Sequence, residues 1–444
     1  MNFGSGLLQG FLNMLPRRRD GQVSSGELER LDEFRLVLPL LKPSTSSGSP
    51  IARSGHRVWT DGQYLYSVGG YNPDHSGPGG PLFQPGPAGD DENEDPDENQ
   101  PLLQEVWRLN LITDSWERMK TAGFFPRTMA SFAMCYDEEG ARLLVFGGTA
   151  IPFGNTASNE LHALSLRGAQ AGQWNELILQ GQSPEPGYGQ ALLAVSPSDF
   201  YLIGGTSGFQ YNMQVHRLRL FRPKTAKEAE EYYAGECENA LKGRQCEVRY
   251  RHEALLHHGR ILIFGGGTRD TCIGFRQLDA LDVKKGEWVR VGTLGDAGVA
   301  ENDGYPPARR CHALVRHKDR VFIIAGFDGE RMYSDVWALD LSSSEPYQWR
   351  KCSFSLPKPL YFHSADITPG GCIYVFGGVL DANGTNRSAD VYRLWLEPPS
   401  LQSTALRLLL KTQPKLLSSA KEELRRLGIP LTCLDWVKVP DKPA

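Results

Sequence analysis

Arginine and histidine recur together in this chain at a spacing that could build a binding site for an anion. The pattern Arg-x-x-His begins at Arg53, Arg249 and Arg309, and Arg127 keeps the arginine without the histidine. A guanidinium group can bind a carboxylate through two parallel hydrogen bonds, so several convergent arginines would suit a peptide C-terminus. The alternative is that these side chains hydrogen-bond within the protein and only build the fold.

Aromatic and basic side chains accompany these arginines and could cover the small apolar residues of a bound peptide. The candidate peptide-binding residues are Arg53, Arg127, Arg249, Arg251, Arg309, Tyr71, Tyr250 and Tyr361, with Phe209 and Phe327 as further aromatic candidates. No nucleophile motif accompanies them. The neighbours His257-His258 and Cys311-His312 lack the further ligands that a metal site needs. We therefore expect a binding protein that is not an enzyme and has no metal or other cofactor.

The composition is that of an ordinary globular protein, with 40% hydrophobic and 23% charged residues. A formal net charge of -4 favours neither nucleic acid nor a membrane surface. Eight cysteines without a Cys-x-x-Cys pair indicate reduced thiols. The stretch Met1–Leu15 carries its positive charges after the apolar residues, unlike a signal peptide. These features predict a protein of the cytoplasm and nucleus that binds neither nucleic acid nor membranes.

A short apolar run that ends in two glycines is the element that must position the arginines. Its copies recur at intervals of roughly 50 to 60 residues, with one longer gap, which indicates a repeat architecture. The five clear copies and one degenerate copy end at Gly70, Gly148, Gly205, Gly266, Gly378 and Gly326. Most copies follow an Arg/His strand and precede a Val/Leu strand, and four precede a tryptophan. Four strands per repeat make one blade of a β-propeller.

This repeat resembles the kelch repeat, six times over, from about residue 53 to residue 396. The glycines would end the second strand where the backbone turns tightly, and the tryptophan would cover the blade face. The resemblance implies an all-β, six-bladed kelch propeller whose inner strands bring the arginines to one mouth of a central channel. The alternating stretch Phe34–Leu38 would supply the missing fourth strand of the last blade and close the ring.

We expect one large domain with extensions at both ends and two insertions. The predicted ranges are a flexible N-terminus (1–32), the propeller (33–397), a helical tail (398–438) and a flexible C-terminus (439–444). Residues 72–100 are rich in proline and glycine and then acidic, which predicts disorder. Residues 224–246 include a predicted surface helix at Ala226–Glu231, in the place of the tryptophan strand of the third blade.

The tail has apolar residues at helical spacing. Leu401, Ala405 and Leu409 recur at steps of four after Ser400 and resemble the Elongin-binding BC box, which offers a narrow apolar ridge to a partner. Downstream residues resemble the start of a cullin-2 box. The cullin-binding candidates are Ile429, Pro430 and Leu434, with Cys433 as the alternative to Leu434. The other interpretation is a helical hairpin that packs on the propeller.

From about residue 51 onward the whole chain is similar to kelch-repeat substrate receptors of Elongin–cullin-2 RING ubiquitin ligases. The resemblance is carried by Ala52–His56, Gly69–Asp74, Phe146–Gly154, Arg249–Glu253 and Ala308–His312. It implies that the propeller holds a substrate's C-terminal peptide ending in glycine or alanine. The tail would dock Elongin B/C and cullin-2 with its RING partner. The long acidic insertion departs from this family. The alternative is a kelch scaffold that binds actin, or a signalling enzyme of a stress-kinase pathway through a protein phosphatase.

Overall fold

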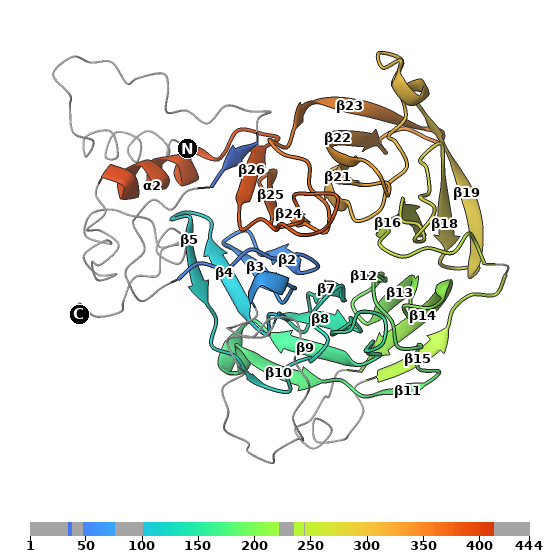
Figure 1. Ribbon diagram of the computed structural model, residues 1–444, viewed down its shortest axis with the longest axis horizontal. Coiled ribbons are helices and arrows are strands. Elements are labelled where there is room, and N and C mark those ends of the chain that lie inside the picture. The colour runs from blue at the N-terminus through green and yellow to red at the C-terminus, as the bar shows by residue number, and fades with distance from the viewer. Residues whose placement is uncertain (1–33, 38–47, 76–100, 222–234, 244, 413–444) are drawn as a thin grey trace, which may run out of the picture.

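The protein is described by a computed structural model over residues 34–37, 48–75, 101–221, 235–243 and 245–412. Within these residues nearly all regular structure is β-strand, and the sheets stand around a common axis (Figure 1). No helix in the described part of the chain is long and apolar enough to cross a membrane. The fold is therefore an all-β propeller built of blades, as the glycine-terminated repeats predict.

The first two sheets each contain an antiparallel four-strand meander. The first consists of β2 (Arg57–Thr60), β3 (Tyr64–Val68), β4 (Val106–Asn110) and β5 (Ser115–Arg118). The second consists of β7 (Ala133–Asp137), β8 (Arg142–Phe146), β9 (Leu161–Ser165) and β10 (Gln173–Glu176), with β6 (Ala122–Gly123) pairing parallel to β10. The edge strand β6 therefore links the two neighbouring sheets.

The third sheet is more regular than the sequence predicts. It consists of β12 (Ala191–Ala194), β13 (Asp199–Thr206), β14 (Tyr211–Leu220) and β15 (Gly235–Asn239), with β11 (Leu179–Gly181) pairing parallel to β15. We expected residues 224–246 to replace the fourth strand, but residues 235–239 of that segment form it. The predicted helix at 226–231 lies outside the described residues.

The next sheet has eight strands. Its first half is β16 (Glu253–His257), β17 (Arg260–Phe264), β18 (Gln277–Asp282) and β19 (Glu287–Leu294). Its second half is β20 (Ala313–His317), β21 (Arg320–Phe327), β22 (Met332–Asp340) and β23 (Tyr347–Ser355). Each half is an antiparallel meander, and the outer strands β19 and β23 join them through a short parallel pairing.

The last sheet joins the two ends of the propeller. It consists of β24 (Ser364–Ile367), β25 (Cys372–Phe376), β26 (Val391–Trp395) and the N-terminal strand β1 (Arg35–Leu36). β1 runs antiparallel to β26, with Arg35 opposite Arg393, and the amide of Val37 donates to the carbonyl oxygen of Val391 at 2.8 Å. The predicted pairing of the stretch 34–38 with the last sheet is therefore confirmed for its described residues, 34–37.

The innermost strands form a closed cycle around the axis. Each contacts the next in the order β2, β7, β12, β16, β20, β24 and back to β2. Just before these strands, six residues with left-handed backbone angles each donate an amide hydrogen bond to the carbonyl oxygen of the preceding member. The members of this axial ring are Gly55, Ser131, Gly189, Arg251, Cys311 and Phe362. Because glycine alone adopts this conformation without strain, four members carry a small conformational cost that the closed ring offsets.

The double glycines bind each repeat to the next one. The amide of Gly266 donates to the carbonyl oxygen of Arg309 at 2.9 Å, and the amide of Gly378 donates to that of Arg53 at 2.8 Å. A Cβ atom added at Gly265 would lie 2.8 Å from the ring of His312, which real side chains do not tolerate. Glycine is therefore favoured at these positions because the following repeat packs directly on them, and only the small Ala325 replaces it among the first glycines of the six copies.

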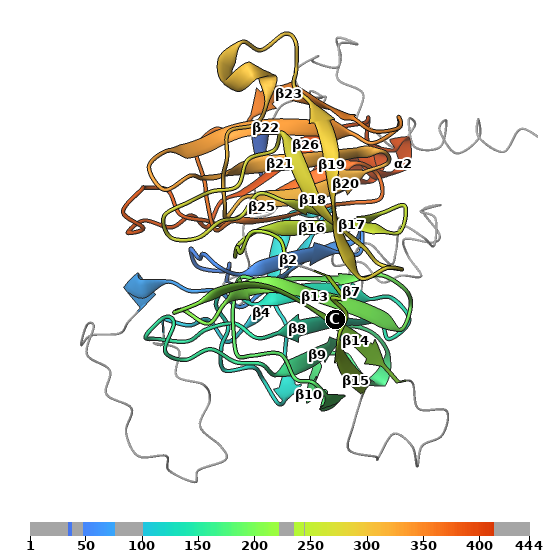
Figure 2. The same cartoon turned by 90° about the vertical axis from the view of Figure 1, so that its right-hand side faces the viewer.

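The described part of the tail forms one helix, α2 (Leu401–Thr412), and the shorter helical turns are η1 (Pro73–His75), η2 (Gly168–Gln170) and η4 (Glu301–Gly304). The hydroxyl of Ser400 accepts the amide of Ser403 at 3.1 Å, which caps α2 where the sequence predicts its start. Figure 2 shows α2 and the blue turn η1 on opposite sides of the propeller.

Candidate functional site

Arg53, Arg249 and Arg309 are buried, and each is hydrogen-bonded to a carboxylate and to backbone carbonyl groups of its own repeat. The Arg53 guanidinium pairs with Glu105 at 2.6 Å and donates to the carbonyl oxygens of Gly69 and Ile51, both at 3.1 Å. Its side chain is 0% exposed. Each of its three nitrogens thus has an acceptor inside the protein and no solvent reaches the side chain, so an external carboxylate cannot reach it without displacing Glu105.

The other two arginines repeat this arrangement. Arg309 donates to both carboxylate oxygens of Asp335, at 2.5 and 3.1 Å, and Arg249 forms an ion pair with Asp279. We therefore interpret Arg53, Arg249 and Arg309 as structural residues, in line with the alternative that their side chains build the fold. In each of these three repeats an acidic residue at or near the start of the third strand supplies the carboxylate that pairs with the arginine, so the charge of the arginine is already balanced within the repeat.

Arg127 does not hold the position that the sequence pattern gave it. Its side chain is exposed, and the amide of Gly70 donates at 2.8 Å to the carbonyl oxygen of Met129. In three other repeats the amide of the second glycine donates to the carbonyl oxygen of Arg53, Arg249 or Arg309. Met129, and not Arg127, therefore holds the equivalent position.

The histidines of the Arg-x-x-His pattern pack on the first glycine of the preceding repeat. His252 lies against Gly204, and His312 lies against Gly265. Burial lowers the pKa of His252 to about 3 and that of His363 to about 4, and it holds the pKa values of His56 and His312 well below the ordinary 6.5. These rings are therefore neutral at physiological pH and act as packing groups.

We expect the protein to lose stability as the pH falls from about 6.5 towards 4, because the unfolded chain then binds protons that the buried histidines do not. Each histidine contributes about 1.4 kcal/mol per pH unit across this window. Burial raises the pKa of Asp366 to about 7, so this one group has the opposite slope. Chemical unfolding across the pH range measures the effect. His363→Gln should reduce the slope of the unfolding free energy against pH by the contribution of one histidine, about 1.4 kcal/mol per pH unit. An unchanged slope would contradict the assignment.

Arg251 lies at the axis and differs from the three paired arginines. It is 7% exposed, it donates to the hydroxyl of Ser131, and its guanidinium carbon lies 4.5 Å from the ring centre of Phe362. A Cβ at Gly55 would lie 3.4 Å from its Nη2. Among the described residues its buried Nε has no hydrogen-bond partner. The side chain therefore crosses the axis with a donor unsatisfied, which is costly unless a ligand supplies an acceptor.

Two further arginines, which the Arg-x-x-His pattern does not single out, stand at the same mouth. Arg310 donates to the sulfur of Cys272 at 3.2 Å, and Arg387 donates to the hydroxyl of Ser54 at 3.0 Å. Neither they nor Arg251 forms an ion pair with a carboxylate of the described residues. One signal could have revealed Arg310, because it occupies the repeat position of the selected Tyr250.

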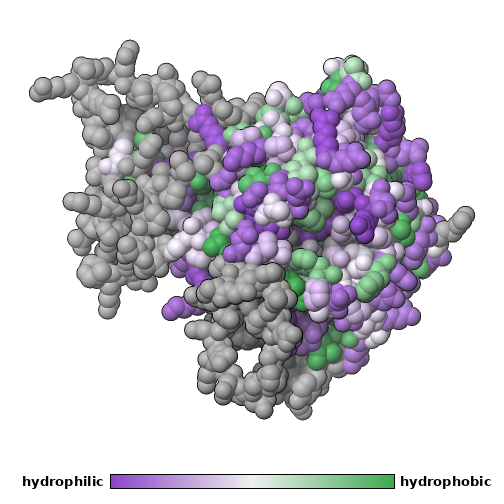
Figure 3. Space-filling model, in the orientation of Figure 1, coloured by the Kyte–Doolittle hydropathy of each residue, from purple (hydrophilic) through white to green (hydrophobic). Residues whose placement is uncertain are grey.

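The aromatic candidates line this mouth. Tyr361 stacks on Phe327 with ring centres 4.7 Å apart, and Tyr71 lies 4.9 Å from the guanidinium carbon of Arg387. Tyr250 packs against two further tyrosines, and Phe209 is 79% exposed. On the face that Figure 3 shows, apolar and polar side chains are intermixed rather than gathered in one apolar patch. The mouth therefore combines aromatic rings with cations that form no ion pair within the described part of the chain.

Below the axial ring, an ion pair and a small cavity occupy the channel. Arg57 and Glu253 form an ion pair at 2.7 Å between β2 and β16. A cavity of ≈ 180 Å³ lies beside them and is lined by residues of β2, β7, β16, β20 and β24. Arg57 is thus paired, and the arginines near the axis without an ion pair among the described residues are Arg251 and those of the mouth above it.

The predicted Elongin-binding residues have different surroundings. Leu401 is 75% exposed, Ala405 is half-buried and Leu409 is 4% exposed, so the expected ridge is accessible only at its N-terminal end. Arg407 pairs with Asp114 in the turn between β4 and β5, and it donates to the carbonyl oxygen of Leu111 at 2.6 Å. That turn lies at the end of β4 away from the glycines. The cullin-binding candidates Ile429, Pro430 and Leu434 lie outside the described residues.

Comparisons with known proteins agree with the repeat pattern. Residues 89–326 match the family described as the KLHDC2/KLHL20/DRC7 Kelch-repeats domain. Kelch domain-containing protein 10 of Homo sapiens is 36% identical over 390 residues, which cover 88% of this chain and 80% of that protein. The protein of that name in Rattus norvegicus is 36% identical over 417 residues, which cover 93% of this chain and 92% of that protein.

More distant relatives match less of the chain. The Kelch domain-containing protein 10 homolog of Drosophila melanogaster is 32% identical over 382 residues, or 80% of this chain and 56% of that protein. Leucine-zipper-like transcriptional regulator 1 of Homo sapiens is 24% identical over 296 residues. The identity, the coverage and the propeller fold agree, and the chain therefore belongs to the Kelch domain-containing protein 10 family of kelch-repeat proteins.

Proposed function

We propose that this protein is the non-catalytic substrate-recognition subunit of an Elongin–cullin-2 RING ubiquitin ligase. Its propeller would bind the C-terminal peptide of a substrate ending in glycine or alanine. The observation that carries the proposal is the contrast among the arginines. Three are paired with carboxylates inside their repeats, while Arg251, Arg310 and Arg387 at the mouth have no carboxylate among the described residues.

A free C-terminal carboxylate has the negative charge and the paired oxygen atoms that would complement these three guanidinium groups. Charge-assisted hydrogen bonds in a partly water-excluded site are about twice as strong as neutral ones. Arg310 and Arg251 are 8% and 7% exposed, so a carboxylate that reaches them loses most of its water and gains several donors. Desolvated charge pairs of this kind discriminate strongly against a neutral ligand.

A small final residue fits the surroundings of Arg251. Its guanidinium lies among Gly55, Ser131 and the ring of Phe362, and it is nearly closed off from solvent. A carboxylate can approach it only if the residue that carries it adds little volume. Glycine and alanine meet this condition, and the stacked rings of Tyr361 and Phe327 would cover the residues before them.

The proposal treats each half of the eight-stranded sheet as one blade, which gives six blades. Two closed patterns support this count. The axial ring has six members, and six bonds run from one repeat to the next, each from an amide near the end of the second strand to a backbone carbonyl before the following inner strand. Both patterns return to their starting point after six steps.

The tail would carry the ligase contacts. Leu401 is exposed at the start of α2, where an apolar ridge can enter a partner's groove. The ion pair of Arg407 with Asp114 holds α2 against the end of the propeller away from the mouth. Substrate and ligase partners would then approach from opposite sides, so the adaptor would act by positioning. Elongin B/C would bind at Leu401 and Ala405, and cullin-2 further along the tail.

We expect Arg310→Ala to weaken binding of a peptide with a free C-terminal carboxylate by about 2 kcal/mol, or about 30-fold, because a desolvated charge pair is lost. Fluorescence anisotropy with a labelled peptide ending in Gly-Gly measures this. Arg290→Ala, an exposed arginine on β19, is the matched control and should leave affinity unchanged. Equal binding of the amidated peptide would rule out the carboxylate contact.

We expect purified Elongin B and C to co-purify with the intact protein and not with Leu401→Ser. Leu401 is exposed, so its replacement should remove the apolar ridge without affecting folding. Gln402→Ser, an exposed neighbour outside the row of Leu401, Ala405 and Leu409, is the matched control and should still co-purify with Elongin B and C. Failure of the intact protein to bind Elongin would contradict the ligase proposal and favour the scaffold interpretation.

A further inference from the structure

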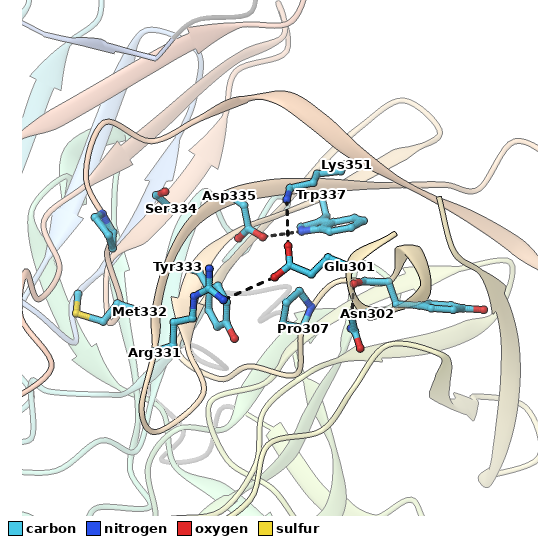
Figure 4. Close-up of a pocket in the computed structure, with 12 residues that line it drawn as sticks. Glu301, Asn302, Pro307, Arg331, Met332, Tyr333, Ser334, Asp335, Trp337 and Lys351 are labelled. Atoms are coloured by element: carbon cyan, nitrogen blue, oxygen red, sulfur yellow. Dashed lines mark hydrogen bonds and ion pairs between the residues drawn. The ribbon is translucent and has the colours of Figure 1, made fainter. Parts of the chain in front are cut away.

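A cavity of ≈ 270 Å³ lies beside the mouth, between η4 and the strands β22 and β23. Its floor is made by Tyr333, Asp335 and Trp337, and Glu301 of η4 reaches into it (Figure 4). Asp335 is already satisfied, because Arg309 and the indole N–H of Trp337 donate to it. The charges that remain available in the cavity are those of Glu301 and two cations.

Those cations hold Glu301 only loosely. Its carboxylate lies 3.7 Å from Nη1 of Arg331 and 3.9 Å from Nζ of Lys351, which is longer than a hydrogen bond. The three side chains are 61%, 67% and 37% exposed, so water screens both pairs. Ion pairs of this kind contribute little to stability, and an external anion with better geometry can replace the carboxylate.

The two cations are placed independently of Glu301. Arg331 lies 5.5 Å from the ring centre of Tyr333, and Lys351 lies 5.7 Å from that of Trp337. Cation–π contacts therefore keep both groups over the aromatic floor. They would stay in place if Glu301 moved away.

The loop that carries Glu301 is also held without its carboxylate. The side-chain amide of Asn302 donates to the carbonyl oxygens of Tyr305 and Pro306 at 3.0 and 3.2 Å. Removal of the Glu301 charge should therefore empty the cavity of its anion and leave the loop as it is.

The cavity adjoins the candidate peptide-binding mouth. Met332 lines the cavity and pairs across β21 and β22 with Phe327. Both side chains belong to the apolar cluster that contains Tyr361. A peptide that ends at Arg251 and passes over Phe327 would therefore reach the cavity with one of its preceding residues.

We propose that this cavity is a subsite for an anionic side chain of the bound peptide, either a carboxylate or a phosphate monoester. Glu301 is an internal substitute that the anion displaces from between Arg331 and Lys351. This inference rests on the proposed function for the identity of the ligand as a peptide. It adds a requirement that the function does not contain, an acidic residue upstream of the C-terminus.

Inorganic phosphate tests the anion site without any peptide. We expect phosphate to raise the unfolding temperature more than chloride at equal ionic strength, and this difference to increase in Glu301→Gln, where the competitor is gone. It should disappear in Arg331→Ala/Lys351→Ala and persist in Arg350→Ala, whose side chain lies on the opposite face of β23. Equal stabilisation of all four proteins would be a general effect of phosphate and would overturn the subsite.

A peptide series then tests the ligand class. Peptides ending in glycine would carry glutamate, phosphoserine or glutamine at successive upstream positions. At one position the acidic peptides should bind at least about threefold tighter than the glutamine peptide. Glu301→Gln should increase this difference in affinity, because the competing carboxylate is gone. Phosphoserine exceeding glutamate would identify a phosphate site. No gap at any position, with amidation still abolishing binding, would overturn the subsite and leave the proposed function intact.

Discussion

Replacing Arg309 by alanine is expected to lower the free energy of unfolding by about 3–5 kcal/mol, the cost of breaking a buried ion pair by removing one partner. Arg309 is 0% exposed, donates twice to Asp335, and donates to the carbonyl oxygens of Ala325 and Pro307 at 3.0 Å each. After the replacement the partly buried carboxylate of Asp335, which is 20% exposed, loses its cation, and two carbonyl groups lose their donor. A cavity also forms beneath the ring of Tyr333, which lies 4.0 Å from the guanidinium carbon.

Urea unfolding of the two single variants and the double variant Arg309→Ala/Asp335→Ala measures this effect. We expect the double variant to be less destabilised than the sum of the single variants, because it leaves no unpaired charge. Arg331→Ala is the matched control, since its side chain is 67% exposed, and it should change stability by no more than about 0.5 kcal/mol. A value for Arg309→Ala as small as that of the control would contradict the structural role.

Deleting residues 1–37 is expected to lower the free energy of unfolding by about 3–5 kcal/mol, the range for loss of a large buried aromatic side chain. Phe34 is 5% exposed, and its ring centre lies 6.2 Å from that of Phe354. It packs in a cluster with residues of the last two meanders, so it joins the two ends of the ring. Loss of β1 would also expose the backbone groups of β26 as an open sheet edge.

Two shorter changes separate these contributions. Deleting residues 1–30 leaves β1 and Phe34 in place and should not alter stability. Phe34→Ala should reproduce most of the loss and keep the strand pairing. Unfolding monitored by circular dichroism compares the four proteins. If the protein without residues 1–37 were as stable as the full chain, β1 would not be needed to close the propeller.

Much of the fold could be predicted from repeated residues. The double glycines marked where each repeat meets the next, because no side chain fits where His252 or His312 packs. The orphan stretch at 34–38 was expected to pair with the last sheet, and its described residues Arg35 and Leu36 pair with β26. The start of α2 followed from Ser400, whose side chain caps the helix.

The sequence also contained a signal for the structural arginines that the Arg-x-x-His pattern by itself does not show. In the three repeats that keep the full Arg-x-x-His pattern, an acidic residue stands at or near the start of the third strand of the same repeat. The pairs are Arg53 with Glu105, Arg249 with Asp279, and Arg309 with Asp335. Reading both positions together would have predicted ion pairs within the repeats.

The amino-acid sequence by itself determined the repeat, the blades and the strand that closes them, because these depend on periodic burial and on tight turns that glycine permits. Only the tertiary structure decided which arginines have no ion pair with a carboxylate of the described residues. An arginine has the same chemistry at Arg309 and Arg310, and its role depends on whether a carboxylate lies within reach. That distance is set by the packing of sheets around an axis, which local sequence does not encode. The mouth of Arg251, Arg310 and Arg387 therefore emerges only when distant repeats meet.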